Sequence, residues 1–142
     1  MNIVFFACCE ICIQDGRSNV LSLINVIDEV SAVAFPVLMP KLTVVAVFTR
    51  AAEEPESDTV RLRAVVGETV IFDLELAVEF QGKLKTRSIG DLQGIPIPAM
   101  GQLHVSIVKN DHEMAGWDIP VMHVGAPQLD LFNSPAGPAA PA

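Results

Sequence analysis

The residues with the most obvious chemical potential are three cysteines near the N-terminus, Cys8, Cys9 and Cys12. Cys9 and Cys12 have the C-x-x-C spacing of redox and zinc motifs, which need both sulfurs on one side of the chain. On a β-strand, residues three apart point to opposite faces, and Cys8 and Cys12, which share a face, lie about 13 Å apart. We therefore interpret the thiols as small buried hydrophobic side chains, and we predict no metal site and no cofactor.

The three histidines are the next candidates for metal binding. His104 and His123 fall on the two strands of a predicted C-terminal hairpin, where the alternation places His104 outward and His123 inward. We therefore do not expect them to converge. His112 lies between acidic neighbours in the turn, which lacks the ordered ligand spacing of a calcium loop. The turn is predicted to be solvated.

Carboxylates alternate along one predicted strand, at Asp73, Glu75 and Glu79. They could serve in acid–base chemistry, but a hairpin offers another interpretation. A three-residue loop over residues 67–69 places Arg63 opposite Asp73, and the same register places Arg61 opposite Glu75. Opposite charges facing each other across antiparallel strands stabilise a sheet by about 0.2–1 kcal/mol per pair. Three later cations are expected to neutralise the far side in the same way: Lys83, Lys85 and Arg87.

Motifs for nucleophilic catalysis or phosphate binding are absent from the sequence. It contains no G-x-S-x-G, no P-loop and no H-E-x-x-H. Ser106 follows His104 on one strand face, but nothing in the sequence orients that pair. We therefore predict that the protein is not an enzyme.

The elements that position these residues are short strands, because period-two alternation dominates the sequence. We predict them at residues 5–13, 20–27, 41–48, 59–66, 70–80, 83–88, 103–109 and 117–124, with an irregular crossover at residues 90–101. About eight strands with long crossings are typical of an all-β fold, an antiparallel β-sandwich of Greek-key, immunoglobulin-like type. A β-barrel is the alternative. Residues 1–125 form this domain, and the Pro- and Ala-rich tail at 126–142 is expected to be disordered.

The length and the net charge of the chain limit the classes of function that it can have. The chain has 142 residues and a formal net charge of −8, which fits one domain with an acidic surface. Such a surface argues against direct nucleic-acid binding and against docking on an anionic membrane. The N-terminus lacks the basic start of a signal peptide, so we expect a cytoplasmic protein with reduced thiols.

The body of the chain resembles a family of short bacterial proteins of unknown function that are predicted to be β-sandwiches. Two segments carry the resemblance, "CEICIQDGRSNVLSLINVID" and "FPVLMPKLTVVAVF". It implies a fold and no activity.

The tail contains "QLDLF", which resembles the pentapeptide by which bacterial polymerases and repair proteins dock on the DNA sliding clamp. The residues are Gln128, Leu129, Asp130, Leu131 and Phe132. In such a complex Leu131 and Phe132 would fill an apolar pocket, and Gln128 would hydrogen-bond at its edge. Alternatively, the apolar residues pack back on the body as an extra strand, or they bind an unrelated partner.

These observations predict a non-enzymatic binding or adaptor module of unknown ligand, tethered to the sliding clamp through residues 128–132. The alternative is a structural or assembly protein, such as a phage or secretion-system component, whose β-sandwich self-associates. In that alternative the tail is folded back on the body.

Overall fold

The computed structural model describes residues 1–125, and over this range the chain forms strands and no helix. The all-β prediction is confirmed. The strands are β1 (Asn2–Gln14), β2 (Leu21–Val26), β3 (Val30–Ala32), β4 (Val37–Thr49), β5 (Ser57–Val66), β6 (Thr69–Glu79), β7 (Lys85–Ile97), β8 (Gly101–Lys109) and β9 (His112–His123).

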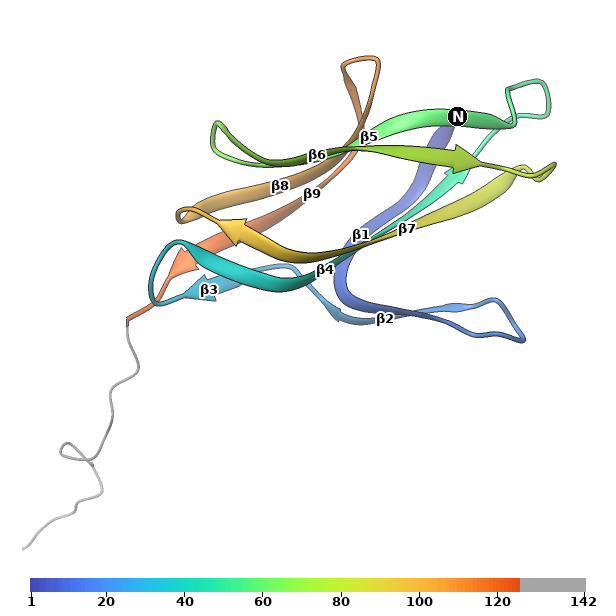
Figure 1. The fold of residues 1–142 in the computed structure, drawn as a ribbon. Coiled ribbons are helices and arrows are strands. Elements are labelled where there is room, and N and C mark those ends of the chain that lie inside the picture. Colours follow the sequence, from blue (N-terminus) through green and yellow to red (C-terminus); the bar gives the residue numbers. More distant parts are fainter. Residues whose placement is uncertain (126–142) are drawn as a thin grey trace, which may run out of the picture.

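The strands form two sheets, which lie on opposite sides of one apolar core (Figure 1). The four-stranded sheet has the order β2-β1-β4-β7, and the five-stranded sheet has the order β3-β9-β8-β5-β6. All neighbours are antiparallel except β3 and β9, which are parallel. In Figure 1 the five-stranded sheet curls over the four-stranded one.

The core is built from the alternate residues of each strand that face the other sheet. Phe48 and Leu42 on β4 belong to the same core cluster as Leu103 and Ile107 on β8, and none of these side chains is exposed. Burying a side chain of this size contributes about 1.5–3 kcal/mol. The residues between them point outward, so each sheet also has an outer face on which functional groups can lie.

Strand β1 pairs with two different strands of the four-stranded sheet, β4 and β2. Its first half pairs with β4 and its second half with β2, with Cys9 as the residue common to both. The turn of the β1–β2 hairpin is fixed by Asp15, whose carboxylate accepts hydrogen bonds from the backbone of Arg17 and Ser18. The Ser18 and Arg17 amides hold the pKa of this carboxyl below its usual range. The two strands predicted at residues 5–13 and 20–27 therefore form the two arms of this hairpin.

Strand β7 differs most from its prediction. It runs without interruption from Lys85 to Ile97, where an irregular crossover was predicted from its glycines and prolines. The strand tolerates these residues because it lies at the edge of its sheet. Pro40 lies inside β4, where the ladder with β7 skips one pair between Met39–Ile95 and Lys41–Gln93. The short strand β3 was not predicted, because its three residues are too few to show a period.

The β5–β6 hairpin confirms the predicted register of its charges. Arg63 lies across from Asp73, and Arg61 lies across from Glu75. The predicted three-residue loop is wrong, since Val66 pairs with Thr69 across a two-residue turn. A bulge between Ala64 and Val65 takes up the extra residue, which restores the register of the charges.

Candidate functional site

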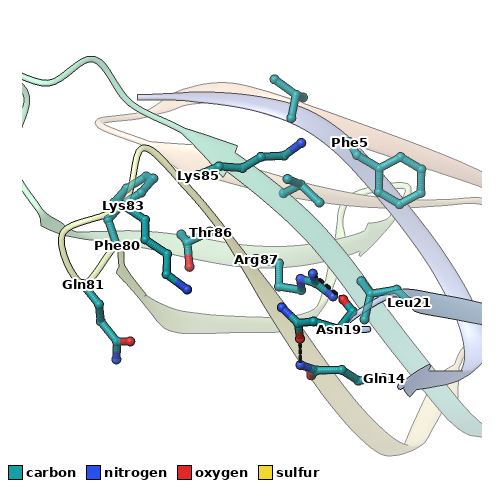
Figure 2. Close-up of a pocket in the computed structure, with 12 residues that line it drawn as sticks. Phe5, Gln14, Asn19, Leu21, Phe80, Gln81, Lys83, Lys85, Thr86 and Arg87 are labelled. Atoms are coloured by element: carbon teal, nitrogen blue, oxygen red, sulfur yellow. Dashed lines mark hydrogen bonds between the residues drawn. The ribbon is translucent and has the colours of Figure 1, made fainter. Parts of the chain in front are cut away.

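A groove of about 790 Å³ lies on the outer face of the four-stranded sheet (Figure 2). Its lining comes from the start of β1, the tip of the β1–β2 hairpin, β4, and the turn that leads into β7. Its apolar lining includes Phe5, Leu21 and Val47, and its cations are Lys83, Lys85 and Arg87. We call this site the basic groove.

The three cations reach the groove because of strand geometry. Lys85 and Arg87 are alternate residues of β7, so both point to the same face, and Lys83 precedes them in the turn after β6. In Figure 2 the ammonium end of Lys85 points toward Phe5, and the guanidinium of Arg87 points toward Asn19. No aspartate or glutamate lines the groove, although the chain has 17 acidic residues and only nine Lys and Arg.

The charges of the groove are not neutralised within residues 1–125. None of its three cations forms an ion pair there, whereas Arg50, Arg61 and Lys109 do. Arg87 donates from Nη2 to the backbone oxygen of Asn19 at 2.8 Å, which joins β7 to the hairpin tip. Its Nη1 is buried without a hydrogen-bond partner in the described part of the chain. A buried donor without an acceptor costs free energy, so an acceptor that reached this nitrogen would be favoured.

The prediction for Lys83, Lys85 and Arg87 is wrong. They were expected to neutralise the carboxylates of the predicted strand at residues 70–80. Strand β7 instead pairs with β4 in the other sheet, so these cations lie on a different face of the molecule. The alternation of Lys83, Lys85 and Arg87 could be seen in the sequence. The local pattern does not show which of the two sheets contains their strand.

A second polar cluster lies on the outer face of the five-stranded sheet. The ring of His104 bonds from Nδ1 to Asp118 Oδ1 at 2.5 Å and from Nε2 to Glu113. Burial opposes protonation of the ring, but the two carboxylates outweigh it and raise the pKa of His104. Gly116 lies beneath the ring, because a Cβ there would come within 2.7 Å of His104 Cε1.

The outward prediction for His104 is confirmed, and that for His123 is wrong. His123 is exposed at the last residue of β9, beyond the buried Val121. It pairs with Ala32 at the end of the strand, and its ring centroid lies 6.4 Å from that of Phe35. Within residues 1–125, no three His, Cys, Asp or Glu side chains are placed to hold a metal ion.

The sequence did not show what orients His104. Asp118 lies directly across from it on β9, and this register could have been derived from the predicted hairpin. Ser106 is two residues away and is only 5% exposed. Both ring nitrogens of His104 are bonded to carboxylates, so neither contacts the serine hydroxyl.

The cysteines are free within the described range, and two of them are buried as predicted. Cys8 faces the core between the sheets, and burial raises the pKa of its thiol to about 12. Cys9 is fully buried on the other side of β1. Cys12 is only half-buried, because the hairpin beyond Cys9 carries it away from the core.

The predicted partner-binding residues, at positions 128–132, lie outside the described residues 1–125. No helix in the described part of the chain is long and apolar enough to cross a membrane. A model of a family of unknown function, DUF6941, matches residues 4–122. This match agrees with the resemblance of the body to a family without a known activity. No curated protein matches the chain.

Proposed function

The chain belongs to this family of unknown function, and we propose that it is a non-enzymatic binding module that holds an anionic ligand or partner in the basic groove. One observation carries the proposal. Three cations without ion-pair partners in residues 1–125 surround an apolar surface, on a chain whose formal net charge is −8. Like charges held together are unfavourable for the free protein, and a bound anion would offset this cost.

The His104 cluster supports the non-enzymatic part of the proposal. A general base must have a nitrogen free to accept a proton from the nucleophile. Asp118 and Glu113 occupy both ring nitrogens of His104, and Ser106 is buried beside them. This arrangement is better suited to holding β8 and β9 together than to proton transfer.

Titration with poly-glutamate, followed by NMR, tests the binding surface. We expect chemical-shift changes at Phe5, Thr86 and the hairpin tip, and no response to poly-lysine. Changes confined to the outer face of the five-stranded sheet, around His104, would contradict the proposal. So would the absence of any change at low ionic strength, where the attraction of exposed charges is strongest.

We also propose that the chain is tethered to the sliding clamp through its QLDLF segment, residues 128–132. The support comes from the sequence alone, since all five residues match the docking pentapeptide. Burial of Leu129, Leu131 and Phe132 would contribute about 1.5–3 kcal/mol for each side chain before ordering costs, so micromolar affinity is expected.

A pull-down with purified clamp tests the tether. The wild-type chain should be retained, and the Leu131→Ala/Phe132→Ala variant should not be. Equal retention of the wild-type chain and the variant would contradict the proposed tether. A loss of several degrees in melting temperature for the same variant would show instead that the segment stabilises the body.

We assign the two sheets to the Greek-key β-sandwich class and the protein to the cytoplasm. The pairing of β4 with β7, while the intervening β5–β6 hairpin lies in the other sheet, supports the fold assignment. Three free cysteines are compatible with a reducing compartment. An experimental structure in which the sheets close into one barrel would contradict the first assignment, and recovery from a secreted fraction would contradict the second.

Self-association is the second candidate function, as expected for an assembly protein. The β1–β2 hairpin exposes several large apolar side chains, among them Ile13 at 49% and Val20 at 61%. Exposed apolar surface of this kind often marks a protein–protein contact. Size-exclusion chromatography at low and high concentration separates the candidates, because a monomer at both would argue against assembly.

A further inference from the structure

We infer that the basic groove recognises an extended acidic segment of a partner protein, with carboxylates at every second residue. This inference rests on the binding function proposed above, and it adds the shape and sequence pattern of the ligand. It depends on the spacing of the cations, on the exposure of the apolar residues around them and on the polar groups at the hairpin tip.

Two of the cations repeat with the period of an extended chain. Lys85 and Arg87 are two residues apart on β7, so their Cα atoms lie about 6.6–6.8 Å apart, whereas Lys83 lies before the strand, in the turn after β6. An extended peptide presents alternate side chains on one side with the same repeat. A segment running alongside β7 therefore brings successive carboxylates to successive cations.

The apolar surface at the groove is too open for a small molecule. Phe5 is 46% exposed, and Val4, which also lines the groove, is 57% exposed. Small-molecule sites bury most of the ligand surface, which needs walls that are themselves enclosed. A peptide, in contrast, can cover an open groove and place one large apolar side chain against Phe5 and Val47.

Polar side chains at the hairpin tip complete the site for a peptide. Gln14 and Asn19 bond to each other at the edge of the groove, and Thr86 lies between the cations on β7. Side-chain amides both donate and accept, which matches the alternating N–H and C=O groups of a peptide backbone. A simple inorganic anion would leave these groups and the apolar surface unused.

Single-stranded nucleic acid is the competing polyanion, because its phosphates also repeat along an extended chain. The molecule is poorly suited to it. Phe5 is the only exposed aromatic side chain among the residues that line the groove. Grooves for single strands stack several bases on aromatic side chains.

Fluorescence anisotropy with three probes tests the inference. The first is a peptide in which glutamate and leucine alternate, the second has the same composition with the glutamates contiguous, and the third is a single-stranded oligothymidine. We expect the alternating peptide to bind about fivefold or more tightly than the contiguous one, because only its carboxylates match the cation repeat. The oligothymidine should bind more weakly than either.

Matched variants assign the binding to the groove. Lys83→Gln/Lys85→Gln removes two exposed cations of the groove and should weaken the alternating peptide about tenfold. Lys41→Gln/Arg63→Gln removes the same charge elsewhere and should leave the affinity unchanged. Circular dichroism confirms that both variants are folded. Phe5→Ser should also weaken binding, with no effect on the salt dependence.

Four results would overturn the inference. Equal affinity for the alternating and contiguous peptides would remove the spacing requirement, while leaving the poly-glutamate result and the proposed function intact. Equal loss in both double variants would show a non-specific charge effect. Tighter binding of oligothymidine, abolished by Lys83→Gln/Lys85→Gln, would make the groove a nucleic-acid site. Concentration-dependent self-association that the same variant abolishes would make a second copy of the chain the occupant.

Discussion

The outer faces of the two sheets differ in how their charges are arranged. On the five-stranded sheet Arg61, Lys109 and His104 are each bonded to carboxylates. Arg61 bonds to Asp73 at 2.8 Å, and His104 lies between Asp118 and Glu113. On the four-stranded sheet the groove collects Lys83, Lys85 and Arg87 with no carboxylate among its lining residues.

Paired charges and unpaired cations are suited to different roles, the first to stability and the second to recognition of a partner. Exposed ion pairs contribute little, about 0–1 kcal/mol each, but they leave no net charge for a partner to recognise. Cations gathered without counter-charges create a local positive potential on an acidic protein. The proposed function therefore assigns a structural role to the face with paired charges and a binding role to the basic groove.

Charge reversal on the two faces gives the largest expected effect. Lys83→Glu/Lys85→Glu should weaken poly-glutamate binding about 30-fold, equivalent to about 2 kcal/mol. Arg61→Glu/Arg63→Glu changes the net charge by the same amount on the other face and should change the affinity less than twofold. Isothermal titration calorimetry at one ionic strength measures both. Similar losses in the two variants would mean that the faces do not differ in function.

Substitution of Gly116 tests whether the His104 cluster stabilises the fold. A Cβ at this position comes within 2.7 Å of His104 Cε1 and 3.2 Å of Glu113 Oε1, so Gly116→Ala must displace the ring from its carboxylates. We expect the free energy of unfolding to fall by about 1 kcal/mol. Gly90→Ala is the control, because a Cβ there meets Leu62 at an ordinary 3.7 Å. Chemical denaturation that shows equal stability for the two variants would exclude a structural role for the cluster.

Local features of the outer face of the five-stranded sheet could be predicted from the sequence. The partners of Arg61 and Arg63 were predicted correctly only because the bulge between Ala64 and Val65 offsets the error in the predicted loop length. That both side chains face outward followed from the alternation of β5 and β6, because successive residues of a strand point to opposite faces. The outward position of His104 followed from the same rule.

The basic groove could not be predicted, because it depends on contacts between distant strands. The partner of β7 is β4, and the hairpin tip that closes the groove at Asn19 lies 68 residues from Arg87. No local pattern assigns an edge strand to one of two sheets. The bend of β1 at Cys9 has the same origin, since it results from pairing with two different strands.

The pH dependence of stability gives a smaller effect, confined to the face with paired charges. The pKa of His104 is raised in the folded protein, so its contribution is complete below the unfolded pKa of about 6.5 and is lost as pH rises through the folded value. We expect the free energy of unfolding to fall by up to about 1 kcal/mol over this window. Denaturation curves across neutral pH should lose this slope in His104→Gln and retain it in His123→Gln. If the His104→Gln variant kept the same pH dependence of stability, another titrating group would be its cause.

The smallest expected effect is on the free energy of unfolding when a single cation is removed. Its sign should differ between the two faces. Arg61→Gln breaks the bond to Asp73 and should lower the free energy of unfolding by about 0.5 kcal/mol. Lys85→Gln removes a cation that is close to Arg87 and has no ion pair within residues 1–125, so it should leave stability unchanged or raise it by a few tenths of a kcal/mol. Thermal denaturation at low salt resolves the two, and added salt should reduce both effects by screening. If Lys85→Gln destabilised the protein as much as Arg61→Gln, the cations of the groove would be part of the fold rather than a charge held for a partner.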